Sequence, residues 1–162
     1  AIGYKGQAYL WLDNSVADGK PWLNPYADAA VQYIGDLIDE LHTAGFEQMV
    51  LENVQFPAST SSKQDYGTTN GVAADQLRAD MAVWEQRFGS GVTLWYSYTL
   101  AEVADTSSTL APGRKLGVKN LVVRVPSAST MTAEERAALV QAQTEAGVEH
   151  VVVRDNAAGY YE

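Results

Sequence analysis

The chain of 162 residues carries 20 acidic and 11 basic side chains, a formal net charge of −9 that argues against nucleic acid or an anionic membrane as a partner. It contains no cysteine, which excludes disulfides, thiolate metal sites and cysteine nucleophiles, and its two histidines are little material for a histidine-rich metal site. No apolar run approaches the ~20 residues of a membrane-spanning helix, so we expect no membrane insertion. We also expect neither a metal nor a cofactor.

Residues 9–12, Tyr-Leu-Trp-Leu, are predicted to form the first strand, which Asp13 closes at its carboxyl end. A helix is predicted to follow. Asn24 is expected to cap it, with Pro25 at the first helical position, where a missing N–H loses no hydrogen bond. Apolar residues at helical spacing continue toward Gly45, which is expected to end the helix.

Residues 48–56 are predicted to form a central strand. Residues 49–51 are apolar without alternation, which is typical of a parallel strand that is covered on both faces. Pro57 cannot donate to a sheet and is expected to end the strand. The following Ser-, Thr- and Gly-rich segment 57–71 is typical of a lid, a binding loop or a disordered segment. Glu52 is therefore expected near the carboxyl end of a parallel strand, where ligands and catalytic groups gather in α/β folds.

The rest of the chain repeats this alternation of helices and strands. The predicted elements are a helix over 72–88, strands over 92–98, 121–125 and 150–154, an irregular segment over 100–117 with a helical turn at 100–104, and a helix over 132–147 that opens with a capping box. This order predicts a single α/β domain over residues 1–162, with a parallel five-stranded sheet, flanking helices and right-handed crossovers.

Two architectures satisfy this order. One is the later half of a TIM barrel, excised from or part of a longer protein, because a complete barrel typically needs ~250 residues. The other is a flavodoxin-like doubly wound sheet. No Gly-rich phosphate-binding loop follows a predicted strand, which disfavours a flavodoxin-like cofactor binder. An incomplete barrel would leave sheet edges for a partner or another domain to cover.

The segment Gly45–Pro57, GFEQMVLENVQFP, resembles a motif that reads Gly-Phe-Asp-Glu-Ile-x-x-Asp-Tyr-x-Arg-Phe-Pro. That motif belongs to a glycoside hydrolase-like family of bacterial (β/α)8-barrel proteins. Glu52 stands where the family has Asp, Asn53 where it has Tyr, and Gln55 where it has Arg. The run Trp-Leu-Asn-Pro-Tyr at 22–26 is similar to the family's approach to the preceding helix. The resemblance covers the first third of the chain and implies a barrel-like fold that acts on carbohydrate.

Carboxylates at strand ends are the candidate catalytic groups. Common glycoside hydrolases use two of them, ~5 Å apart in retaining enzymes and ~6.5–9.5 Å apart in inverting ones. Neighbouring strands lie ~4.8 Å apart, and the predicted strands end in Asp13, Glu52 and Asp155. We take Glu52 as nucleophile or base and Asp13 or Asp155 as the partner acid. The alternatives are turn-forming roles for the aspartates and a structural ion pair of Arg124 or Arg154 with Glu52 or Asp155.

Five further residues are candidates for saccharide binding. Asn53 and Gln55 can hydrogen-bond sugar hydroxyls, although neither can transfer a proton or supply the charge of the family's Arg. Trp95 and Tyr98, on a predicted strand, offer faces on which sugar rings stack, with core packing as the alternative. Tyr66 lies in the long loop and is expected to contact ligand if that loop closes over a cleft.

Two functions remain open. The chain is either a carbohydrate-active domain related to glycoside hydrolases, or a non-catalytic module that binds glycan or packs against another domain of a larger protein. Asn53 and Gln55 favour the second reading, and the carboxylate kept at Glu52 favours the first. The expected partners are a saccharide or glycan and other domains of a larger protein. The expected location is the exterior or cell surface of a bacterium, with the cytoplasm as the alternative.

Overall fold

The computed structural model describes residues 1–14, 17–57, 62–69, 71–104, 116–126, 129–155 and 159–161, and of residues 155 and 159–161 the backbone alone. Parts of the predicted loop 57–71 and irregular segment 100–117 therefore lie outside the described residues. Within the loop, residues 64–65 form a short strand. Within the irregular segment, the predicted turn is present as α3 (Leu100–Ala104).

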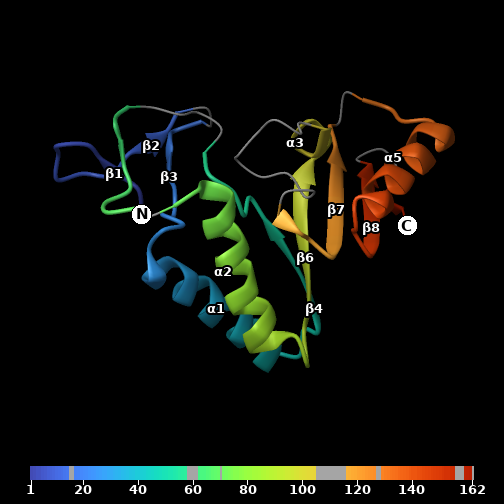
Figure 1. Cartoon of the computed structure of the whole chain (residues 1–162), viewed down its shortest axis with the longest axis horizontal. Helices are drawn as coiled ribbons and strands as arrows, with labels where there is room; N and C mark the ends of the chain where they lie inside the picture. Colours follow the sequence, from blue (N-terminus) through green and yellow to red (C-terminus); the bar gives the residue numbers. More distant parts are fainter. Residues whose placement is uncertain are drawn as a thin grey trace.

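The main sheet contains four parallel strands and one antiparallel strand (Figure 1). Its order is β4-β6-β7-β8-β9, with β9 antiparallel to β8. The strands are β4 (Gln48–Glu52), β6 (Thr93–Thr99), β7 (Asn120–Val125), β8 (His150–Asp155) and β9 (Gly159–Tyr161). The predicted α/β fold with a parallel sheet is thus confirmed, although the parallel part has four strands and not five.

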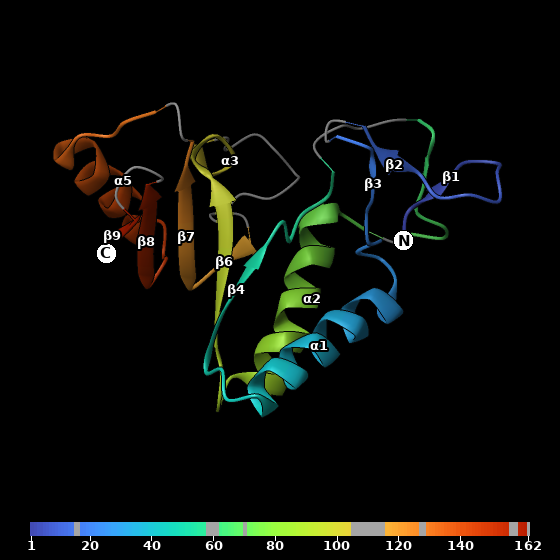
Figure 2. The same cartoon turned by 180° about the vertical axis from the view of Figure 1, so that it is seen from behind.

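The predicted first strand at 9–12 is absent from this sheet. Its end forms β2 (Leu12–Asp13), which pairs antiparallel with β3 (Lys20–Pro21), while Leu10 bridges to Gly3. Nearby, β1 (Gly3–Tyr4) pairs with β5 (Gln64–Asp65). Figures 1 and 2 show β1, β2 and β3 gathered at the N-terminal end, apart from the main sheet. The left-handed backbone of Asp18 and Gly19, with φ of 66° and 59°, reverses the chain and lets local antiparallel pairing replace the predicted parallel pairing.

The four parallel strands lie side by side in their order along the chain. A flavodoxin-like sheet reverses its strand order at a switch point, and no such reversal occurs among the described strands. Consecutive neighbours are the arrangement of a barrel segment.

The two faces of the sheet differ in what covers them. The register places Met49, Leu94, Tyr96, Leu121 and Val151 on one face, and these join side chains of the helices in a single core cluster. The helices that contribute are α1 (Asp28–Thr43), α2 (Ala73–Phe88), α3 and α5 (Ala133–Glu145). The second face carries Val50, Glu52, Trp95, Ser97, Val122, Arg124, Val152 and Arg154. We refer to these surfaces as the helix-covered face and the second face.

The helix ends follow the predictions except at the start of α1, where neither the cap at Asn24 nor the first helical position at Pro25 is confirmed. Thr132 and Glu135 form the predicted capping box of α5, and Gly45, with φ of 99°, follows the last turn of α1. Helix α1 begins at Asp28, with Ala27 as an N-cap that has no side-chain hydrogen bond. Asn24 instead accepts a hydrogen bond from Tyr26 N, 3.1 Å away, so its short side chain closes a turn before the helix.

No helix in the described part of the chain is both long enough and apolar enough to cross a membrane.

Candidate functional site

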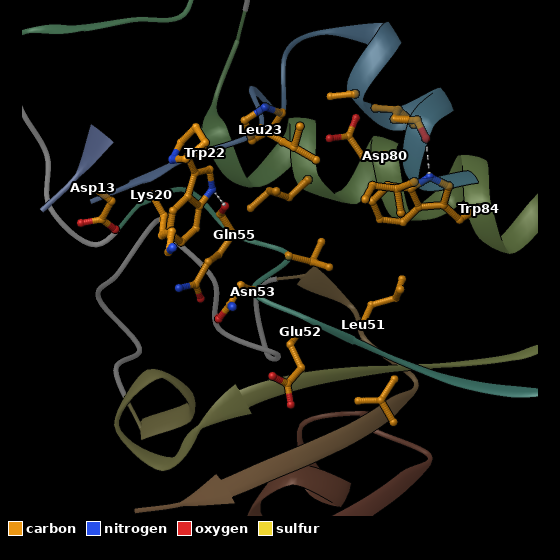
Figure 3. Close-up of a pocket in the computed structure, with 18 residues that line it drawn as sticks. Asp13, Lys20, Trp22, Leu23, Leu51, Glu52, Asn53, Gln55, Asp80 and Trp84 are labelled. Atoms are coloured by element: carbon orange, nitrogen blue, oxygen red, sulfur yellow. Dashed lines mark hydrogen bonds between the residues drawn. The ribbon is translucent and has the colours of Figure 1, made fainter. Parts of the chain in front are cut away.

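A pocket of about 480 Å³ lies along β4 and the segment that follows it, walled by α1, α2 and the chain around β3 (Figure 3). Residues 50–55 contribute one wall without interruption. Because β4 is the end strand of the sheet, side chains from both of its faces can reach one pocket at its edge. The polar lining residues are Asp13, Lys20, Glu52, Asn53, Gln55 and Asp80.

Glu52 is held by two arginines on the second face. Its Oε2 lies 3.3 Å from Arg124 Nη1, and its Oε1 lies 3.6 Å from Arg154 Nη1. The arginines come from β7 and β8, so the ion pairs span the parallel strands. This is the arrangement that the ion-pair reading of the sequence predicts. In Figure 3 the Glu52 side chain points away from Asp80.

Asn53 and Gln55 lie where the motif places them, at the end of β4. Asn53 has a left-handed backbone, φ of 59°, which Asn tolerates better than most residues, and its Oδ1 lies 3.5 Å from Arg124 Nη2. Gln55 is buried, and its Nε2 donates to Glu102 Oε1 at 2.9 Å. Its Oε1 is buried without a hydrogen-bond partner among the described residues. Such an atom is costly to leave unpaired, but almost none of its surface is accessible, so a ligand in the pocket does not reach it in this structure.

The aromatic side chain beside these residues is Trp22. Its Nε1 donates to the Gln55 carbonyl oxygen at 3.1 Å, which fixes the indole against the pocket wall (Figure 3). Trp22 was not expected to bind ligand, because its position just before the first helix suggests packing beside the helix entry. Its place in the Trp-Leu-Asn-Pro-Tyr run next to the motif was the available signal.

Asp80 is a second residue that the sequence analysis misses. It lies on α2, is only 5% exposed, and lines the pocket while its Oδ1 accepts a hydrogen bond from Gln76 Nε2 at 2.7 Å. Burial raises the pKa of Asp80 to about 6; the hydrogen bond from Gln76 opposes this rise and the charge of Asp28 adds to it. The signal was its helical position, three residues after Leu77 and four before Trp84, on the apolar face of the helix.

Asp13 reaches the pocket from an unexpected element. It is buried and belongs to the β2–β3 hairpin, where its Cα partner is Lys20, and so the expectation that it ends a parallel strand is wrong. Asp155 ends β8 as expected, but its side chain lies outside what the structure describes. Asp13, Glu52 and Asp80 therefore line one pocket from three separate elements.

The three aromatic candidates lie elsewhere. Tyr98 is fully buried in the core and its hydroxyl donates to the Val54 carbonyl oxygen at 3.0 Å, which leaves no surface for a sugar. Tyr66 packs against Tyr26, with ring centroids 5.9 Å apart, in an aromatic cluster beside the helix. Trp95 lies on the second face, with its ring centroid 6.3 Å from that of His150. None of the three lines the pocket.

Among the residues that the structure describes, no group of three or more His, Asp or Glu side chains could hold a metal ion. Comparisons with protein-family models, curated proteins and solved structures gave no match for this chain. The function is therefore argued from the pocket and from the motif that resembles the glycoside hydrolase-like barrels.

Proposed function

We propose that the chain is a carbohydrate-binding domain related to glycoside hydrolases, and that it holds a saccharide in the pocket beside β4. The observation that carries the proposal is the Trp22 indole, which its hydrogen bond to the Gln55 carbonyl oxygen fixes against the pocket wall, together with the exposed polar side chains of Lys20 and Asn53 in the same lining. An indole face packs against the C–H groups of a sugar ring. Polar side chains in the same lining form hydrogen bonds with sugar hydroxyls, so these groups together suit a ring that is apolar on one side and polar at its rim.

The remaining lining supports the same ligand class. Lys20 and Asn53 can donate hydrogen bonds, and Asp13 and Asp80 can accept them, so hydroxyls around a ring meet both kinds of partner. The volume of about 480 Å³ falls within the ~300–1,000 Å³ of small-molecule sites. The described lining contains a single basic side chain among these polar groups, which favours a neutral saccharide over a polyanionic one.

Binding without cleavage is the form that the geometry supports best. Hydrolysis of the common kind needs two carboxylates that face one bond ~5–9.5 Å apart. Glu52 instead faces Arg124 and Arg154 and points away from Asp80 in Figure 3. Gln55, in the position of the family's Arg, gives its amide to Glu102 and brings no charge to the pocket.

Hydrolysis is the second candidate, favoured by Asp80. A carboxyl whose pKa is raised to about 6 by burial keeps its proton into the pH range where a general acid must donate one. In this form Asp80 is the acid, and Glu52 or Asp13 supplies the second carboxylate.

The proposed function also implies a location and partners for the chain. A glycan-binding domain of this kind belongs on the exterior or cell surface of a bacterium, where glycans are presented. Other domains of a larger protein are then its neighbours, and an uncovered edge of the sheet at β4 is a place for them to pack.

A panel of neutral oligosaccharides tests the proposal by calorimetric titration. We expect at least one to bind, and Trp22→Ala to weaken it tenfold or more, because the stacking face is lost. Trp95→Ala is the matched control: it removes the same side chain from the second face, outside the pocket, and should leave the affinity unchanged. Absence of binding across the panel, or equal losses in both variants, would refute the proposal. Release of reducing ends that Asp80→Asn abolishes would instead establish hydrolysis.

A further inference from the structure

The outer edge of β4 lies beside an apolar groove. Among the described strands, β4 is the end strand of the main sheet and its one pairing partner is β6. A second cavity of about 360 Å³ continues the pocket along this edge, lined by Leu37 and Leu41 of α1 and by Phe46 and Val50. All four of these side chains are exposed by between 38% and 56%. The edge sequence Gln-Met-Val-Leu-Glu has neither the proline nor the lysine that usually protects such an edge.

Helix α1 lies against this groove as a crossover helix does. In a β-α-β unit, the strand before the helix lies parallel to the strand after it, and the helix covers the pair. α1 leads directly into β4, and its apolar stripe of Ile34, Leu37 and Leu41 faces the groove. The position that the preceding strand would take, beside β4 and beneath α1, is the groove itself.

The segment that precedes α1 has the pattern of the missing strand. Residues 9–12 are continuously apolar and are predicted to be a strand from the sequence. In the structure they lie at the N-terminal end with Tyr9 58%, Leu10 48% and Leu12 42% exposed, whereas Trp11 is buried. The groove and three of the four side chains of this segment therefore expose apolar surface, and they are joined by the same helix.

We propose that residues 9–13 have a second position, in which they insert into the groove as a strand parallel to β4. In leaving its present position, the segment loses four sets of backbone contacts: the bridge from Leu10 to Gly3, the hydrogen bonds from Tyr4 N to Tyr9 O and from Trp11 N to Ile2 O, and the two-residue ladder of β2 with β3. Residues 14–27 connect the inserted strand to the start of α1 and are long enough to cross the carboxyl edge of the sheet, at ~3.3 Å for each extended residue.

The register of the inserted strand against β4 follows from the acidic residue at the end of each strand. Asp13 and Glu52 each close an apolar run, which places Leu12 level with Leu51 and Leu10 level with Met49, on the helix-covered face. Alternation then puts Trp11 on the second face, beside Val50 and in the row that Val50 shares with Trp95. A shift by one residue would reverse both faces, so this register is strongly specified.

Insertion would also bring Asp13 next to Glu52. Asp13 would lie beside Glu52 on neighbouring strands, ~4.8 Å apart, which matches the ~5 Å separation of retaining glycoside hydrolases. Arg124 and Arg154 already face Glu52 and would balance the added negative charge. This last step rests on the hydrolytic form of the proposed function, whereas the strand insertion does not.

Because the chain has no cysteine, disulfide trapping tests the insertion directly. Tyr9→Cys with Gln48→Cys joins two exposed positions that the register places level, within the ~4.4–6.8 Å Cα separation of a disulfide. Leu10→Cys with Gln48→Cys is the matched control, one residue out of register and on the opposite face. We expect the first pair to form an intramolecular disulfide at least tenfold faster than the control, as followed on non-reducing gels and by peptide mass.

Equal rates for the two pairs, or disulfide-linked dimers only, would overturn the proposal. If the double variants fail to fold, amide exchange of the unmodified protein supplies the second measurement. Insertion should protect the amides of residues 48–52 that do not bond to β6, and free-edge exchange at these positions would overturn it. Neither measurement involves a saccharide, and glycan binding is measured on the unmodified protein. Glycan binding without crosslinking in the cysteine variants refutes insertion alone, and crosslinking in those variants without glycan binding by the unmodified protein refutes the proposed function alone.

Discussion

The Tyr98 hydroxyl donates a hydrogen bond to the carbonyl oxygen of Val54, 3.0 Å away, and so ties β6 to the segment that follows β4. Tyr98 is fully buried, and burial, with a smaller contribution from the charge of Glu102, raises the pKa of its hydroxyl above the ordinary value. The hydroxyl therefore stays protonated and remains a donor. Val54 lines the pocket, so this bond positions the pocket wall from within the core.

Tyr98→Phe should lower the free energy of unfolding by about 1–2 kcal/mol, because the Val54 carbonyl oxygen loses a buried donor. Tyr96→Phe is the matched control on the same strand and face. The Tyr96 hydroxyl donates to Glu85 Oε1, and Glu85 is exposed, so water can replace the lost bond and the loss should be smaller. Urea titration of both variants measures the difference, and equal losses would contradict the tethering role of Tyr98.

Glu52 and Arg124 should be coupled, but weakly. Their side chains are 42% and 25% exposed and the closest N–O distance is 3.3 Å, so solvent screens the pair. We expect a coupling energy of about 0.5–1 kcal/mol in a double-mutant cycle built from Glu52→Gln and Arg124→Met. The same cycle with Arg154, which is more exposed and 3.6 Å away, should give a smaller value. A larger coupling for Arg154 would contradict this ranking.

Strands β7 and β8 were predictable from the sequence because they are largely apolar. Residues 121–125 and 150–154 are nearly unbroken apolar runs, and the structure forms strands at Asn120–Val125 and His150–Asp155. The same pattern at residues 49–51 predicted a central strand that is covered on both faces, and this was wrong, because β4 is the end strand and Val50 is 46% exposed. Residues 9–12 show the limit of the same reasoning. An apolar run predicts a strand but does not identify the strand with which it pairs. Here the end of the run pairs with the nearby Lys20–Pro21 and not with β4.

The sequence predicted the pocket residues on and after β4, but not those that other elements contribute. Glu52 ends β4 near the position where a carboxylate was expected, but the strand was predicted over 48–56 and ends four residues earlier, because Asn53 has a left-handed backbone with φ of 59°. Asn53 and Gln55 therefore line the pocket from the segment after β4. Trp22 and Asp80 come from a loop and a helix, and their position in the pocket depends on how these elements pack against β4. The ion pairs of Glu52 arise in the same way, since Arg124 lies two strands away from it in the sheet.

Removing a capping hydroxyl from the start of α5 and adding one at the start of α2 should change the stability in opposite directions. Thr132 accepts a hydrogen bond from Glu135 N in the capping box of α5, so Thr132→Ala should cost about 1 kcal/mol of stability. The N-cap of α2 is Val72, which is 56% exposed and makes no side-chain cap. Its extended backbone suits a capping hydroxyl, so Val72→Ser should stabilise the protein by about 0.5–1 kcal/mol. Thermal unfolding of the two variants checks both signs, and a destabilised Val72→Ser would contradict the cap assignment.

Asp80 should make stability fall as the pH rises through the weakly acidic range. Burial raises its folded-state pKa to about 6, whereas an unfolded Asp titrates near ~3.9. Between these two values the folded state binds the additional proton. Protonation of Asp80 therefore contributes stability that is fully present below about pH 4 and is lost as the pH rises through about 6.

Asp80→Asn should remove this dependence. Its amide oxygen can still accept the bond from Gln76 Nε2, and no charge remains to be buried above pH 6. The variant should match the wild type near pH 4 and exceed it by about 1–3 kcal/mol at pH 7.5, as measured by urea unfolding across the pH range. Asp36→Asn is the control with an exposed carboxyl, because Gln32 Nε2 donates to Asp36 Oδ1 at the same 2.7 Å and the same spacing. It also removes the ion pair of Asp36 with Arg87, so it should not reproduce the gain in stability at pH 7.5. If the free energies of unfolding of the wild type and Asp80→Asn change in parallel between pH 4 and 7.5, the buried carboxyl does not titrate in this range. Asp80 would then not be suited to act as the acid of a hydrolytic site.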